Sequence, residues 1–146
     1  MGAEGERQYV MYADDHAINR RLVQKKLTRA GVIGDDDEKV GLILAEHGDM
    51  AREMLQEYAG QIIAAGLDNT MRPGPLGTEL VPLANELKIP VAVFTDDLVQ
   101  EGDFEGEGKI FIKPDELNGL IDWFSEKVEA ALAEQVDPAL DSDKES

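Results

Sequence analysis

Chemically active side chains stand at the ends of short apolar runs of the sequence. In chain order they are Asp14 and Asp15, Asp68, Thr95, and Lys113. Three carboxylates brought together would repel one another unless a cation or a lysine neutralised them. A hard divalent ion such as Mg²⁺ takes oxygen ligands and keeps waters that a phosphate oxygen can replace. These residue types therefore indicate phosphoryl transfer, with Asp68 as the nucleophile that forms an acyl phosphate.

The apolar runs have the pattern of strands in a parallel sheet. They are short and continuous, as strands buried on both faces are, and stretches with helical periodicity separate them. The expected strands are residues 9–13, 40–45, 62–67, 91–94 and 110–112. In such sheets ligands bind outside the carboxyl ends of the strands, where the active residues would meet. The sequence predicts an α/β fold, a three-layer sandwich with a five-stranded parallel sheet.

Apolar residues at helical spacing predict four helices. They centre on residues 18–30, 50–55, 78–87 and 117–132. The stretch 96–109 differs, because its glycines lie among acidic residues and allow one helical turn at most. The fourth helix of a regular alternating pattern is thus expected to be short or missing. We predict an N-terminal tail at 1–7, one domain at 8–133 and a frayed acidic tail at 134–146.

The composition excludes several classes of protein. With 31 acidic against 14 basic residues the formal charge of the 146-residue chain is −17, which repels nucleic acid and anionic membranes. The absence of cysteine excludes disulfides, thiolate metal sites and cysteine nucleophiles. No apolar run approaches the roughly 20 residues of a membrane span, and the N-terminus lacks an apolar signal core. We therefore expect a cytoplasmic protein of one domain.

Each active residue also has an ordinary structural interpretation. Asp15 can cap a helix, and Asp68 can open a turn with the asparagine that follows it. Thr95 suits a strand, and Lys113 suits a solvated surface. Their order at the ends of successive runs is what favours the functional interpretation.

Two histidines and one tryptophan lie outside this set. His16 follows the acidic pair and could approach a metal, but we expect it in solvent at the start of a helix. His47 is expected on a surface loop. Trp123 lies beside the core residue Phe124, and the sequence leaves open whether it is buried or forms a partly exposed contact surface.

Five motifs accompany the active residues in a fixed order. They are Ala13-Asp14-Asp15, Ala45-Glu46-His47-Gly48, Leu67-Asp68-Asn69-Thr70-Met71 with Pro73 and Gly77, Val93-Phe94-Thr95, and Phe111-Ile112-Lys113-Pro114. In this combination the chain resembles the receiver domain of two-component response regulators over residues 8–133. The resemblance implies a flavodoxin-like sheet of five parallel strands wrapped by helices.

The resemblance also implies roles for single residues. Asp68 would be the phosphoacceptor, and Thr95 and Lys113 would contact the phosphoryl group. The implied cofactor is Mg²⁺, with ligands from Asp14, Asp15, Asp68 and the carbonyl of Thr70. The implied donor is a phosphohistidine on a sensor histidine kinase or a histidine phosphotransfer protein.

Three positions depart from the family pattern. Arg72 is inserted between the methionine and the proline that follow the acceptor. Asp96 stands after Thr95, where the family usually has a small residue, and its carboxylate would repel a phosphoryl group. Ile110 occupies the place of the family's switch aromatic, while the adjacent Phe111 should face the other side of the strand.

We interpret the chain as a stand-alone receiver that is phosphorylated on Asp68 and signals to a downstream protein target or passes the group on. Apart from its own phosphorylation and dephosphorylation we expect no enzyme activity. The departures keep open a degenerate receiver that binds partners without phosphorylation. A haloacid-dehalogenase-like phosphatase is a further alternative, but that family needs a second Asp where Thr70 stands and has its nucleophile on the first strand.

Overall fold

Strands and helices alternate along the chain. The computed structural model describes residues 7–34, 40–96 and 99–145. The strands are β1 (Tyr9–Ala13), β2 (Gly41–Ala45), β3 (Ile62–Leu67), β4 (Val91–Thr95) and β5 (Lys109–Ile112). The helices are α1 (Ala17–Arg29), α2 (Gly48–Glu57), α3 (Gly77–Glu86) and α4 (Leu117–Glu145).

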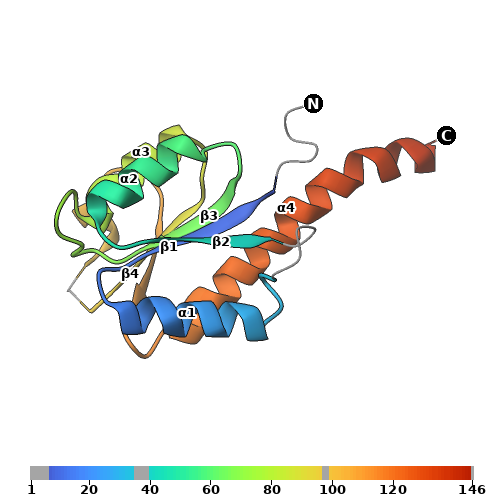
Figure 1. The fold of residues 1–146 in the computed structure, drawn as a ribbon. Helices are drawn as coiled ribbons and strands as arrows, with labels where there is room; N and C mark the ends of the chain where they lie inside the picture. Colours follow the sequence, from blue (N-terminus) through green and yellow to red (C-terminus); the bar gives the residue numbers. More distant parts are fainter. Residues whose placement is uncertain (1–6, 35–39, 97–98, 146) are drawn as a thin grey trace.

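The five strands form one parallel sheet in the order β2-β1-β3-β4-β5. Helices α2 and α3 cover one face, and α1 and α4 cover the other (Figure 1). Side chains of β1 alternate between the two layers: Val10 and Tyr12 pack with α1 and α4, whereas Met11 and Ala13 pack with α2 and α3. The predicted three-layer sandwich with a five-stranded parallel sheet is confirmed.

The central strand β3 shows why continuous apolar runs form this sheet. All six of its residues are buried, so neither face tolerates a polar side chain. Gly66 faces α4, and a Cβ atom there would lie 2.9 Å from Cζ of Phe124. The missing side chain therefore lets the ring of Phe124 pack directly on the strand.

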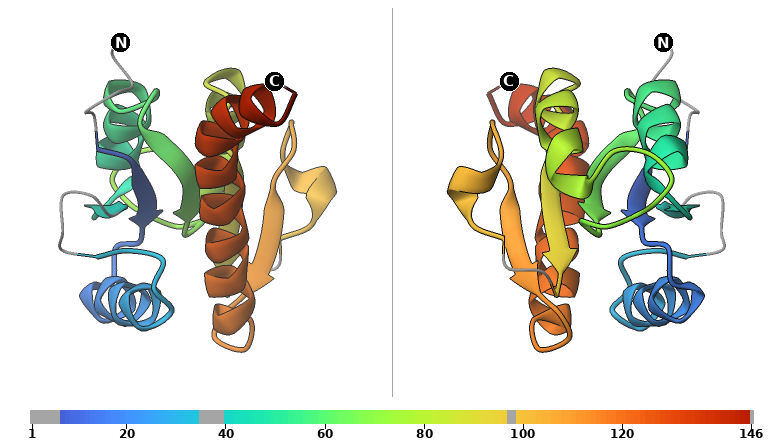
Figure 2. Two further views of the ribbon diagram at one scale, coloured as in Figure 1. Left: turned by 90° about the vertical axis from the view of Figure 1, so that its right-hand side faces the viewer. Right: turned by 90° about the vertical axis from the view of Figure 1, so that its left-hand side faces the viewer.

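The connection from β4 to β5 contains little helix, as the sequence predicts. In its described part, residues 96 and 99–108, the only helical structure is a 3₁₀ turn, η1 (Glu101–Asp103). Figure 2 shows this connection as a loop with one short turn on the β5 side of the molecule. It is attached to α3 by Asn85, which accepts from the backbone N of Glu107 at 2.6 Å and donates to its O at 2.9 Å.

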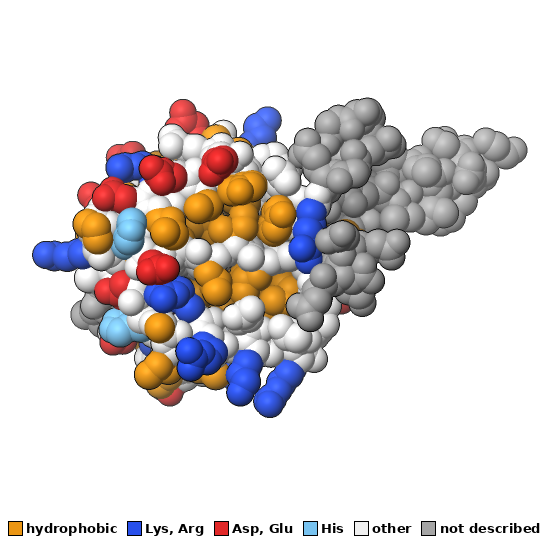
Figure 3. All heavy atoms as spheres, in the orientation of Figure 1, with side chains coloured by type: hydrophobic (Ala, Val, Ile, Leu, Met, Phe, Trp, Pro, Cys, Tyr) orange, Lys and Arg blue, Asp and Glu red, His pale blue; other side chains and the backbone are white. Residues whose placement is uncertain are grey.

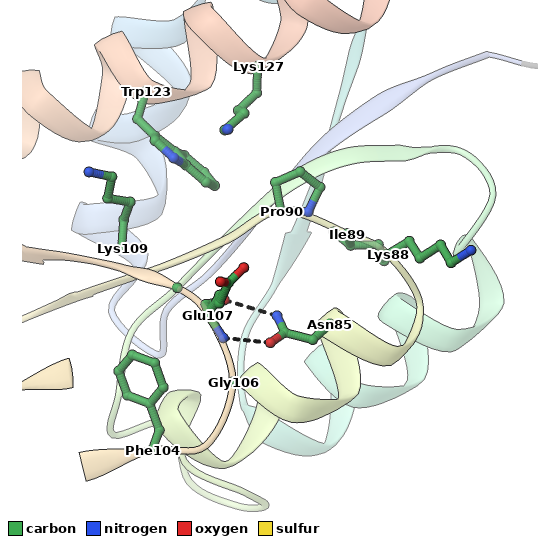
Figure 4. A pocket seen from close by; sticks show the side chains of 11 residues that line it. Asn85, Lys88, Ile89, Pro90, Phe104, Gly106, Glu107, Lys109, Trp123 and Lys127 are labelled. Carbon is green, nitrogen blue, oxygen red and sulfur yellow. Dashed lines mark hydrogen bonds between the residues drawn. The ribbon is translucent and has the colours of Figure 1, made fainter. Parts of the chain in front are cut away.

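Between this loop, α3 and α4 lies a hollow of about 920 Å³ at the amino ends of β4 and β5 (Figure 4). Trp123 lines it from α4 and is nevertheless buried, with 6% of its surface exposed. Of the two interpretations that the sequence leaves open for Trp123, the structure supports burial.

Helix α4 extends further than the sequence indicates. It continues through residues 134–145, where the sequence analysis expects a frayed tail. Among the described residues, no helix has both the length and the apolar character that crossing a bilayer requires.

Candidate functional site

The register of the sheet brings the ends of its strands side by side. Ala13 of β1 pairs with Leu67 of β3, so the next residues, Asp14 and Asp68, are neighbours. The backbone continues this pairing, because N of Asp68 donates to O of Ala13 at 2.8 Å. At the other side of the site, N of Lys113 donates to O of Thr95 at 3.0 Å. Residues up to 99 positions apart in the sequence thus meet at one edge.

Lys113 joins the two buried aspartates. Its Nζ lies 2.8 Å from Oδ2 of Asp14 and 3.3 Å from Oδ1 of Asp68. Asp14 is fully buried and Asp68 is 4% exposed. Two carboxylates are removed from water around one ammonium group, which is costly unless another positive charge is available. The structure therefore brings together three of the residues that the sequence identifies.

Tyr12 is a contact of this site that the sequence analysis missed. Its hydroxyl donates to Oδ2 of Asp14 at 2.6 Å, and the backbone N of His16 donates to Oδ1 at 3.0 Å. Tyr12 lies in a strand that reads as an apolar run, so only its spacing could have revealed it. A residue two positions before Asp14 points to the same side of an extended chain.

The two buried aspartates differ in their proton affinity. Burial and the charge of Asp14 raise the pKa of Asp68 to about 7, although Lys113 acts in the opposite direction. Burial also raises the pKa of Asp14, but hydrogen bonds from Lys113, Tyr12 and His16 outweigh it and leave that pKa below its usual value. Asp14 is therefore a fixed negative charge, whereas the protonation of Asp68 depends on the charges around it.

Lys113 keeps its charge in this environment. Burial lowers the pKa of its ammonium group, but the hydrogen bond and charge of Asp14, together with the charge of Asp68, outweigh burial and raise it. With Asp14, Asp15 and Asp68 ionised, one lysine leaves two negative charges uncompensated. A divalent cation would balance them.

The ligand atoms for such a cation are close enough together. One oxygen each from Asp14, Asp15 and Asp68, with a ring nitrogen of His16, lie within 4.8 Å of one another. Ligands on opposite sides of Mg²⁺ lie about 4.2 Å apart, since its bonds are about 2.1 Å long. The acidic cluster is compatible with the Mg²⁺ ion that the sequence predicts.

This cluster opens into a hollow of about 780 Å³. The residues that line it are Asp15, His16, Ala17, Ile18, Asn19, Asp68, Thr70, Asp96 and Lys113. Thr70 is thus at the site, and so is the carboxylate-bearing Asp96 that departs from the family pattern. Thr95 is fully buried at the end of β4 and does not line the hollow.

The inserted Arg72 does not enter the hollow. It is exposed on the loop after β3, in which the Arg72–Pro73 bond is cis. The loop is attached to α2, where N of Asp49 donates to O of Pro73 at 3.1 Å. Gly74 has φ +112°, and a Cβ atom there would overlap N of Asp49, so this turn requires glycine.

The histidines differ from each other in position. His47 is the N-cap of α2, and its Nδ1 accepts from N of Met50 at 3.1 Å. His16 has 69% of its side chain exposed, as expected at a helix start, yet its Nδ1 lies 3.0 Å from Oδ1 of Asp15. The expectation that His16 lies only in solvent is therefore incomplete, since its ring nitrogen belongs to the cluster.

Comparisons with known proteins agree with this architecture. No protein-family model and no curated protein matches the sequence. Among solved structures, a response regulator receiver protein from Sinorhizobium medicae WSM419 is 22% identical with a TM-score of 0.69, covering 86% of this chain and 97% of its own. A receiver domain protein (CheY-like) from Methanospirillum hungatei JF-1 is 18% identical with a TM-score of 0.67, covering 88% and 99%.

A response regulator receiver domain protein from Clostridium thermocellum gives the same result, with 15% identity, a TM-score of 0.67 and coverage of 85% and 96%. Identities at this level report on the fold, and the high coverage shows that the likeness extends over nearly the whole of each neighbour. The chain has the fold of response regulator receiver domains.

Proposed function

We propose that this protein is a response regulator receiver that accepts a phosphoryl group on Asp68 in a reaction that requires a divalent metal ion. The observation that carries the proposal is the position of Lys113 Nζ, 2.8 Å from Asp14 and 3.3 Å from Asp68 at the mouth of the hollow. A nucleophilic carboxylate, a fixed positive charge and a set of carboxylate ligands are the groups that phosphoryl transfer to aspartate needs.

The transfer forms a bond between a carboxylate oxygen of Asp68 and phosphorus. It breaks the phosphorus–nitrogen bond of a phosphohistidine, whose imidazole leaves with the electron pair. Lys113 counters the negative charge on the phosphoryl oxygens, and Asp14 and Asp15 would hold the ion. The bound ion supplies a second positive charge to the same oxygens.

The surface around the hollow supports a protein as the phosphoryl donor. This donor would be a sensor histidine kinase or a histidine phosphotransfer protein. Ile18 lines the hollow and is 77% exposed, and Leu22 follows one helical turn later with 41% exposed. Apolar side chains beside a charged site favour contact with a protein surface. Under this proposal the protein acts in the cytoplasm, signals to a downstream protein target and binds no nucleic acid.

The test is labelling of the full chain with acetyl phosphate, followed by intact-mass spectrometry with and without Mg²⁺. The wild type should gain one phosphoryl group only with Mg²⁺, and Asp68→Asn should gain none. Asp122→Asn, an exposed aspartate on α4, is the matched control and should label normally. Equal labelling of Asp68→Asn and wild type would refute the proposal.

Asp96 favours a second candidate, a receiver that binds its partners without phosphorylation. Its carboxylate lines the hollow, where it would repel an incoming phosphoryl group. Asp96→Ala separates the two candidates. Slow labelling that becomes fast in Asp96→Ala supports a weakened phosphoacceptor, whereas no labelling in either protein supports the phosphorylation-independent module.

A further inference from the structure

His16 brings a nitrogen atom into a site otherwise made of carboxylates. Its Nδ1 lies 3.0 Å from Oδ1 of Asp15 and 3.3 Å from Oδ1 of Asp14. Its own backbone N donates to the same Asp14 oxygen at 3.0 Å, so the residue is held against the cluster at two points. As the N-cap residue of α1 it makes no side-chain capping bond, and its ring nitrogen instead contacts the two aspartates.

The spacing of these atoms suits neighbouring ligands on one ion. Two ligands at right angles on a metal with bonds of about 2.1 Å lie about 3.0 Å apart, and tetrahedral ligands lie about 3.4 Å apart. The two distances from Nδ1 of His16 fall in this interval. The aspartate oxygens involved do not compete with Lys113, which contacts Oδ2 of Asp14 rather than Oδ1.

We propose that His16 is a metal ligand through Nδ1 and that it makes this site selective for a divalent first-row transition-metal ion, such as Zn²⁺, Co²⁺ or Mn²⁺, over Mg²⁺. This inference rests on the metal site of the proposed function. Imidazole binds transition metals well, whereas Mg²⁺ prefers oxygen and retains its waters. Asp15 and Asp68 supply oxygens that either kind of ion accepts, so the selectivity comes from His16.

The experiment compares Zn²⁺ and Mg²⁺ binding to the tag-free full chain by isothermal titration calorimetry. The variant is His16→Asn, because asparagine is a favourable N-cap and should preserve the start of α1. The control is His47→Asn. His47 is the second of the two histidines in the sequence, and it is the N-cap residue of α2. Figure 3 shows the two histidines at the same end of the molecule but apart from each other.

We expect His16→Asn to weaken Zn²⁺ binding by about tenfold or more, since loss of even an outer partner of a metal site weakens binding by about 10- to 100-fold. The same variant should weaken Mg²⁺ binding by less than about twofold. His47→Asn should change neither affinity. In ¹⁵N spectra of the side chains, Zn²⁺ should shift the Nδ1 resonance of His16, and Mg²⁺ should leave it in place. Circular dichroism of each variant verifies folding, and His16→Ala serves as the second variant.

Equal Zn²⁺ affinity in wild type and His16→Asn would overturn the inference, and so would equal weakening of both ions. These outcomes differ from a failure of the proposed function. If His16 is not a ligand, Mg²⁺-dependent labelling of Asp68 still occurs in both proteins. If instead the wild type does not label, while Zn²⁺ binding depends on His16, the phosphoacceptor proposal fails and the metal ligand stands.

Discussion

The two ends of the sheet each carry a hollow, and they differ in what surrounds it. The hollow at the amino ends of β4 and β5 is the larger, about 920 Å³ against about 780 Å³ at the carboxyl ends. In Figure 4 its Lys88 points away from Trp123 and Lys127. Within the described parts of the chain, neither Lys88 nor Lys127 has a carboxylate at salt-bridge distance.

The amino-end hollow contains one local pair of hydrogen bonds. Asn85 and the backbone of Glu107 are hydrogen bonded to each other, and that pair fixes the loop. At the carboxyl ends, by contrast, Asp14 and Asp68 are buried with one lysine between them. Buried charge costs stability, so it persists where function requires it. Convergent buried charge, rather than volume, distinguishes the carboxyl end, which holds the candidate functional site.

The largest expected loss of stability is that of Lys113→Met in metal-free protein. It should lower the free energy of unfolding by about 3 kcal/mol, because it removes the cation that lies between the two buried carboxylates. The matched control is Lys109→Met on the same strand, at the amino-end hollow, which should change it by less than about 0.5 kcal/mol. Urea denaturation measures both. Similar losses of unfolding free energy in the two variants would show that buried charge does not distinguish the two ends.

Asp68→Asn should stabilise the metal-free protein at pH 8. The pKa of Asp68 is about 7 in the fold and close to its usual, lower value in the unfolded chain, so raising the pH ionises the unfolded state first and disfavours folding. The variant should gain about 2–4 kcal/mol over wild type at pH 8, and the gain should shrink as the pH falls to 5.

Urea denaturation at several pH values tests this gain. Glu107→Gln, at the other hollow, should differ from wild type by less than about 0.5 kcal/mol at pH 8. A gain for Asp68→Asn that stays constant from pH 5 to pH 8 would show that its carboxylate is not the cause.

A divalent ion should stabilise the carboxyl end of the sheet specifically. At a concentration about 100 times its dissociation constant, Mg²⁺ should raise the free energy of unfolding of the wild type by about 2.7 kcal/mol. Asp15→Asn should lose most of this gain, because one ligand is missing, and Lys109→Met should keep it. Thermal unfolding with and without the ion measures the difference.

The smallest expected effect comes from the loop of the amino-end hollow. Gly106 has φ +96°, and a Cβ atom there would overlap Oδ1 of Asn85. Gly106→Ala should therefore cost about 1–2 kcal/mol of stability. Because Gly106 and Asn85 line the amino-end hollow and not the carboxyl-end hollow, labelling of Asp68 by acetyl phosphate should be unchanged. A loss of labelling would mean that the two ends are coupled.

The sheet was readable from the sequence because buried parallel strands require continuous apolar residues. The run 62–67 coincides with β3, and the residues that follow the strands do meet at one edge. Tyr12 was not recognised, since its hydroxyl is hidden within an apolar strand. The contact of the His16 ring with the aspartates could not be predicted either, because spacing alone cannot show where the ring at a helix start points.

The proposed function depends most on Asp68 as the acceptor at the carboxyl edge. Backbone NMR of the full chain with Mg²⁺ and beryllofluoride, a phosphoryl mimic, tests it most directly. We predict shifts centred on Asp68, Thr70, Asp96 and Lys113, little change at Asn85 and Glu107, and no response in Asp68→Asn. Shifts centred on the amino-end hollow, or an unchanged response in Asp68→Asn, would contradict it.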